Sequence, residues 1–139
     1  MRNKTTLILM EQACMLLVFA LAAVLCLRAF VWSDTASKES VKRDRALLEA
    51  QNVAESVKGR QGDFSAVGRL CGGRWEEDAG WILYDANWEE TQEKPAYTLR
   101  CVRTQEETEY LEGALVEVLE GERTLASLRV VWQGVDIHE

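Results

Sequence analysis

Glycine and proline are absent from the first 58 residues of this chain: all nine glycines and the single proline lie beyond Lys58. A glycine in a helix interior costs about 1 kcal/mol and a proline about 3 kcal/mol, so their absence permits one uninterrupted helix. Over residues 7–58 such a helix would be about 78 Å long at about 1.5 Å per residue. A small globular domain cannot cover that length. We therefore expect the first half to lie in a membrane and the second half to stand outside it.

Histidine is also scarce, because His138 near the C-terminus is the only one. This excludes a multi-histidine metal site and disfavours Ser-His or Cys-His catalysis. The chain has no G-x-x-x-x-G-K-[ST] loop for nucleotide phosphates. Asp85, Asn87 and Glu89 alternate as a calcium loop begins, but Glu90 stands where an EF-hand needs glycine. We therefore expect no enzyme activity, no cofactor and no metal, with a looser calcium site as the alternative to an acidic connection.

Residues 7–27 form the apolar run, 21 residues with one charge, Glu11. This length suffices to span about 30 Å of hydrocarbon. Phe30 and Trp32 follow where interfacial anchors are expected, and Arg28 can extend toward lipid headgroups. A cleaved secretory signal is disfavoured, since small residues are missing at the place of the cut. The run therefore predicts a single transmembrane helix over residues 7–32.

Charge divides the chain at the same border. Residues 1–58 hold eight Lys/Arg and six Asp/Glu, whereas residues 59–139 hold eight Lys/Arg and 17 acids. A head with a net charge of −9 repels phosphate backbones, so we expect it to bind no nucleic acid directly. Basic residues flank the apolar run on both sides, but the stub of residues 1–6 is too short to fold. We therefore expect a protein of the cell membrane with a cytoplasmic N-terminus and an extracytoplasmic head.

The helix is expected to continue through residues 33–58, first as a polar stalk and then with a thin apolar stripe. Gly59 is suited to end it. The stripe comprises Leu47, Ala50, Ala54 and Val57, with Ala46, Leu48 and Val53 beside them. It is too short for a long coiled coil, so we expect it to be covered by the head.

The head, residues 59–139, is predicted to contain a short helix after the N-cap Asp63 and then four strands with period-two patterns. The strands are expected at residues 81–84, 97–102, 114–119 and 124–132. Short links between them favour an antiparallel meander. The expected fold class is therefore α+β, with a long N-terminal helix and a small sheet. Four head tryptophans are expected to lie mainly in the core: Trp75, Trp81, Trp88 and Trp132.

The four cysteines form two sets. Cys14 and Cys26 lie about 18 Å apart along the apolar helix and cannot bridge within one chain. Cys71 and Cys101 lie in the head, where they could pair if the head is outside the cell. The alternative is two buried thiols.

The order of a basic stub, a glutamate near the start of an apolar helix, an amphipathic continuation and a short antiparallel sheet resembles type IV pilin-like proteins. It is most similar to minor pilins and pseudopilins of Gram-positive bacteria. Residues 7–27 resemble the family's processing and packing segment, whose fifth mature residue is usually glutamate. Aligning Glu11 to that position places the mature N-terminus at Leu7. The family's peptidase typically expects glycine before the cut, and Thr6 stands there instead.

This resemblance implies a structural subunit that assembles through its apolar helix into a type IV pilus or a pseudopilus of type II secretion or competence. Its partners would be the membrane, other pilin-like subunits and the prepilin peptidase, with the assembly ATPase and platform acting indirectly. Glu11 would pair with a neighbour's N-terminal amine and fix the axial register. The alternatives are a Glu11 paired with Lys4 or water at the lipid boundary, and a single-pass scaffold or adaptor whose head binds a partner.

Overall fold

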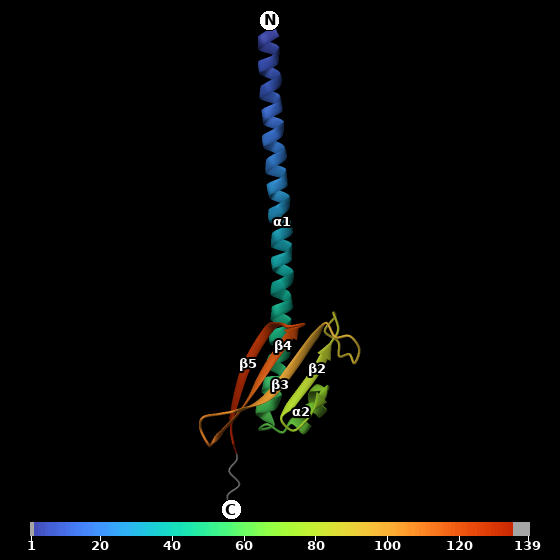
Figure 1. Ribbon diagram of the computed structural model, residues 1–139, viewed down its shortest axis with the longest axis vertical. Coiled ribbons are helices and arrows are strands. Elements are labelled where there is room, and N and C mark those ends of the chain that lie inside the picture. The colour runs from blue at the N-terminus through green and yellow to red at the C-terminus, as the bar shows by residue number, and fades with distance from the viewer. Residues whose placement is uncertain (1, 135–139) are drawn as a thin grey trace, which may run out of the picture. The chain divides into compact units, whose positions relative to one another are not determined.

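The computed structural model describes residues 2–134, so His138 lies outside the described part of the chain. Its first element is helix α1, Arg2–Gly59, which runs without interruption for 58 residues (Figure 1). The absence of glycine and proline before Gly59 accounts for this continuity. The prediction of one long helix is confirmed. The compact unit that holds the sheet begins at Lys42, and α1 up to Val41 forms a separate unit.

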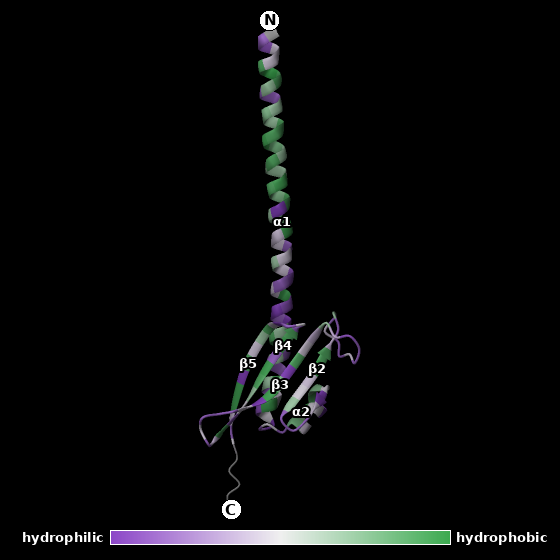
Figure 2. Cartoon of the chain, viewed as in Figure 1, coloured by the Kyte–Doolittle hydropathy of each residue, from purple (hydrophilic) through white to green (hydrophobic). Residues whose placement is uncertain are grey.

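Residues 7–27 of α1 are predominantly apolar, with Glu11 as the one charged residue among them (Figure 2). Large side chains project outward along it, with Leu16 70% exposed and Phe19 73% exposed. Trp32 at the end of this stretch is 76% exposed. A helix that is apolar all round needs an apolar environment. Within residues 2–134, α1 is the one helix long and apolar enough to cross a membrane.

The last turns of α1 pack against the sheet through Ala46, Ala50, Val53 and Val57, each at most 2% exposed. Their spacing of four, three and four residues keeps them on one face of the helix. The predicted stripe was therefore wrong at Leu47 and at Leu48 beside it, which are 39% and 46% exposed. Two of these four residues are alanines, and neither has any exposed surface.

Helix α2, Phe64–Cys71, follows a short turn after α1. Asp63 is its N-cap, as predicted, and its carboxylate accepts a hydrogen bond of 3.1 Å from the Ala66 amide. Phe64 and Val67 on α2 are buried in the same core as the stripe of α1. Two helical segments, the last turns of α1 and helix α2, therefore cover one face of the sheet.

Five antiparallel strands form the sheet in the order β1-β2-β3-β4-β5, which confirms the predicted meander (Figure 1). The strands are β1 Arg74–Trp75, β2 Ala79–Tyr84, β3 Tyr97–Gln105, β4 Leu111–Glu120 and β5 Arg123–Gln133. The two-residue β1 was not predicted, since it is too short for a periodic pattern. The other strands are longer than predicted because pairing with a neighbour extends them beyond their apolar cores.

The inner face of the sheet supplies the rest of the core. Ile82, Leu99 and Val118 lie in register across β2, β3 and β4, and each is at most 1% exposed. Cys101 and Val116 form the next fully buried pair. The core of the head thus lies between this face and the helical segments.

Replacing Ala50 by leucine tests the close approach of helix and sheet. Ala50 has no exposed surface, so the larger side chain must displace the strands. We expect Ala50→Leu to lower the free energy of unfolding by about 1–3 kcal/mol. Denaturant unfolding of the full chain in detergent, followed by tryptophan fluorescence, measures this. Gln51→Leu at the next, exposed position is the control and should change stability by less than about 0.5 kcal/mol.

Candidate functional site

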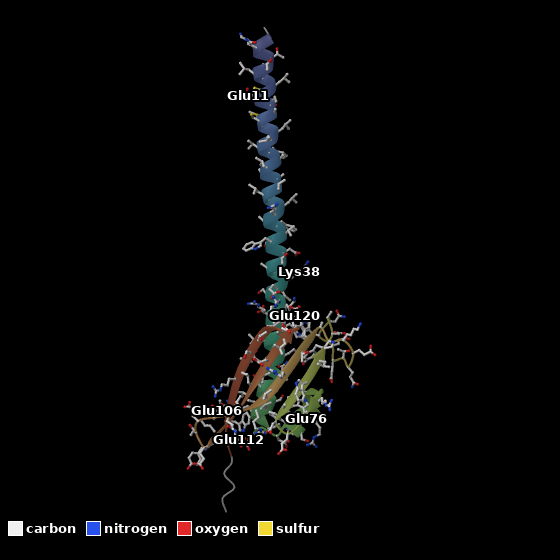
Figure 3. The ribbon with its side chains drawn as sticks, viewed as in Figure 1. Glu11, Lys38, Glu76, Glu106, Glu112 and Glu120 are labelled. Carbon is white, nitrogen blue, oxygen red and sulfur yellow. The ribbon has the colours of Figure 1, made fainter. Side chains whose placement is uncertain are left out.

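The candidate site on α1 is the face that carries Glu11 (Figure 3). A shallow groove along the helix surface is lined by Glu11, Cys14, Met15, Val18, Phe19 and Ala22. These positions repeat at three or four residues, which places them on one face of the helix. The result is a strip with one carboxylate at its N-terminal end and apolar side chains below.

Glu11 has no ion pair with Lys4, the nearest described cation before it in the sequence. A carboxylate in apolar surroundings is costly unless a cation or hydrogen-bond donors compensate it. An ionisable residue within a membrane segment is a functional-site hypothesis for this reason. The Glu11 carboxylate therefore needs a cation or hydrogen-bond donors in apolar surroundings. Within the described part of the chain, no ion pair supplies one.

Thr6 and Leu7, the predicted processing junction, lie within α1, and Leu7 is 67% exposed. Cleavage between the two residues stays a prediction.

Cys71 and Cys101 both lie at the head core as free thiols. Cys101 is fully buried, and this burial raises the pKa of its thiol to about 12, a net value that includes a lowering by the charge of Arg103 and a smaller raising by Cys71. Cys71 is half-buried at the end of α2. The topology brings the two cysteines near each other, but the disulfide stays a prediction.

Arg103 connects the sheet to the turn after α1, a role that the residue patterns did not predict. Its guanidinium donates to the Gly62 carbonyl at 2.8 Å and contacts the carboxylates of Glu112 at 3.1 Å and Asp78 at 3.3 Å. It also lies over the rings of Phe64, at 5.0 Å, and Trp132, at 6.0 Å. The signal was present, because Arg103 continues the inward series Tyr97, Leu99, Cys101 on β3. A charge at an inward position predicts compensating partners.

Gly62 allows this connection because its backbone is in the left-handed region, with φ of +78°. A Cβ atom at this position would lie 2.4 Å from the ring of Trp132. Only glycine therefore fits the turn beneath Trp132 without displacing it.

The acidic connection between β2 and β3 is held by its own side chains. Asp85 accepts hydrogen bonds from the amides of Asn87 at 2.8 Å and Glu89 at 3.0 Å. Trp88 stacks on Tyr97 with ring centroids 4.0 Å apart. The Asp85 carboxylate thus serves the turn, and residues 2–134 contain no cluster of three or more His, Cys, Asp or Glu residues that could hold a metal.

The head tryptophans divide between core and surface. Trp132 is 5% exposed, and Trp75 and Trp88 pack half-buried against the core. Trp81 is half-buried and belongs to the opposite face of the sheet, because its neighbours Gly80 and Ile82 face the core. The prediction of a mainly core role is confirmed for three of the four.

The turn between β4 and β5 is tied to α1 by an ion pair. The Lys42 ammonium lies 2.8 Å from the Glu120 carboxylate, and Arg123 lies 2.8 Å from the same side chain. The hydrogen bond from Lys42 lowers the pKa of Glu120. This pair joins the first turn of α1 in the compact unit to the far end of the meander.

The Lys42–Glu120 pair predicts a pH-dependent contribution to stability. Because the folded pKa of Glu120 is lowered, the contribution is present above the ordinary carboxyl value of about 4.3 and is lost as pH falls through the lowered value. We expect Lys42→Met to lower the Tm at pH 7, and the difference from the unmodified chain to vanish in acid. Lys58→Met, an exposed lysine on the same helix, is the control. A Lys42→Met difference that is independent of pH would contradict this assignment.

The chain matches none of the protein-family models, curated proteins or solved structures with which it was compared.

Proposed function

We propose that this chain is a non-enzymatic, pilin-like structural subunit that assembles through its apolar N-terminal helix into a type IV pilus or a type II secretion or competence pseudopilus. The single observation that carries the proposal is Glu11 at the start of an apolar helix that continues into the head. The helix is unbroken from Arg2 to Gly59. Its last turns form part of the head core.

The shape of the groove around Glu11 supports lateral assembly. The apolar members of the strip, from Cys14 to Ala22, can pack against the apolar helix of a neighbouring subunit. Cysteine and alanine within the strip permit close approach of two helices. In such a bundle Glu11 would be removed from water and would require a cation. A neighbour's N-terminal ammonium satisfies that requirement at one axial position only, which fixes the register of the two rods.

The same proposal includes the orientation of the chain in the membrane. The N-terminus is cytoplasmic, α1 crosses the cell membrane once, and the acidic head is extracytoplasmic. Other pilin-like subunits are the direct partners. The assembly ATPase and the membrane platform act on the subunit from the cytoplasm and the membrane.

A single-pass scaffold or adaptor is the second candidate, and Thr6 favours it. With threonine instead of glycine before the cut, the leader would stay attached and Leu7 would not become an N-terminus. Glu11 would then lie at the lipid boundary, with Lys4 or water as its partner.

Substituting Glu11 tests its role in assembly. We expect Glu11→Leu to reduce co-purification with a partner pilin-like subunit about tenfold or more, because the charged contact that fixes the register is lost. Insertion into the membrane should persist, since an apolar residue replaces a charged one. Gln12→Leu, the next residue on a different face of the helix, is the matched control. Co-purification that is equal for Glu11→Leu and the unmodified chain would remove Glu11 from the interface.

The mature N-terminus separates the two candidate functions. For a processed pilin-like subunit, mass spectrometry of the protein purified from its own cells should find an N-terminus at Leu7. An intact Met1 would instead support the single-pass adaptor. Thr6→Gly restores the family's residue before the cut and should increase processing if the peptidase acts at this junction.

A further inference from the structure

A cavity of about 750 Å³ lies at the edge of the sheet formed by β1 and β2. This volume falls within the range of about 300–1,000 Å³ that is typical of small-ligand sites. Trp81 and Leu83 of β2 alternate with the buried Ile82, so they lie on the face of the sheet opposite the core. The other walls come from β1, from the turn that follows it and from the connection after β2. The side chains that line the cavity include Arg74, Glu76, Trp81, Leu83, Glu90 and Gln92.

Backbone contacts fix the walls of this cavity. Gly73 has a φ of +80°, and a Cβ atom there would lie 2.4 Å from the Trp81 carbonyl oxygen, so only glycine fits. The Gly73 amide donates a hydrogen bond of 2.8 Å to the Glu90 carboxylate, which ties the start of β1 to the connection after β2. The Thr91 amide donates to the Leu83 carbonyl at 2.8 Å and holds the same connection against β2. The cavity is therefore preformed.

The ring of Trp81 has no aromatic packing partner. Trp75 packs on Phe64 with ring centroids 5.4 Å apart, and Trp88 stacks on Tyr97 at 4.0 Å. Within residues 2–134, no ring packs on Trp81 in this way. Its side chain is half-buried and lies outside the hydrophobic core. The indole thus offers an apolar, electron-rich face to a ligand in the cavity.

Polar groups around this ring retain hydrogen-bonding capacity. In the described part of the chain, the indole N–H of Trp81 and the side-chain amide of Gln92 make no hydrogen bond. Arg74 and Glu76 approach each other only to 3.9 Å, which is too long for a hydrogen bond, and their side chains are 84% and 58% exposed. Together these four groups supply both donors and acceptors.

The charges of the cavity favour a neutral ligand. The head carries 17 acids against eight Lys/Arg, and Glu76 and Glu90 add two carboxylates to the cavity wall, so an anion is repelled. Each carboxylate already has a neighbour, the Gly73 amide for Glu90 and Arg74 for Glu76, so no uncompensated charge is left for an organic cation. Residues 2–134 contain no group of three or more His, Cys, Asp or Glu residues that could hold a metal ion.

We propose that this cavity binds a neutral pyranose sugar, either free or as a residue of a glycan. The C–H groups of the sugar ring stack on the face of the Trp81 indole. Its hydroxyl groups donate to Glu76, accept from Arg74 and the indole N–H, and do both with Gln92. An aromatic platform with a few placed polar groups is the usual composition of a small-ligand site. This assignment rests on the head alone and does not depend on the function proposed for Glu11.

The test measures sugar binding to the full-length chain in lipid nanodiscs, since many detergents carry sugar headgroups themselves. The probes are the methyl glycosides of glucose, galactose, mannose and N-acetylglucosamine. Sorbitol serves as an open-chain polyol and glucose 6-phosphate as a charged ring. Saturation-transfer difference NMR identifies the probe protons that contact the protein and yields the affinity. We expect at least one methyl glycoside to bind through its ring C–H protons, sorbitol not to bind, and glucose 6-phosphate to bind about tenfold more weakly than the methyl glycosides.

A hexasaccharide of the sugar that binds best separates the two sources of the ring. A glycan site should bind the hexasaccharide about tenfold or more tightly than the methyl glycoside, because neighbouring rings add contacts. A site for a free sugar should show no such gain. Either result supports a sugar site.

Variants of the cavity complete the test. Trp81→Ala removes the stacking surface and should weaken the sugar about tenfold. Tyr110→Ala removes an exposed aromatic side chain that does not line the cavity, and this matched control should bind as the unmodified chain does. If Trp81→Ala loses exchange protection in β3 and is therefore unfolded, Gln92→Ala at an exposed position decides, with an expected loss of about fivefold.

Four results would overturn the proposal. They are binding by none of the methyl glycosides, equal binding by sorbitol, tighter binding by glucose 6-phosphate, and unchanged binding by the folded cavity variants.

Discussion

The packing of the last turns of α1 against the inner face of the sheet is the contact on which the rest of the structure depends. Ala46, Ala50, Val53 and Val57 face the fully buried residues of β2, β3 and β4. Without this helix the meander would expose the part of its apolar face that α2 does not cover. The head is therefore not independent of α1, because the last turns of that helix form part of its core.

This shared helix relates the site on α1 to the head. In the proposed arrangement, the first half of α1 is surrounded by lipid or by the helices of neighbouring subunits. Glu11 then fixes the axial register between α1 and a neighbouring helix. The Lys42–Glu120 pair and Arg103 then fix the meander and the turn to the same helix.

Much of this fold could be predicted from residue patterns. The missing helix breakers predicted α1, Asp63 predicted the start of α2, and period-two alternation predicted four strands in their observed order. Residue patterns were less informative where a contact between distant parts of the chain decides which residue is buried or whether a strand forms. Leu47 has the larger apolar side chain, yet it is 39% exposed, because the helix turns the face with Ala46, Ala50, Val53 and Val57 toward the core. Strand β1 exists only because β2 offers it an edge. The register role of Glu11 was suggested by the sequence, whereas the role of Arg103 depends on partners up to 41 residues away in the chain.

The most direct test of a single helix shared between two environments is a nitroxide scan of residues 7–58 by electron paramagnetic resonance in lipid bilayers, with oxygen and a water-soluble nickel chelate as relaxing agents. We expect high oxygen accessibility over residues 7–27 and high nickel accessibility over residues 33–44. Labels at Ala46, Ala50, Val53 and Val57 should be protected from both agents, with one helical period through all three regions. A break in that period, or nickel accessibility throughout residues 7–27, would contradict the account.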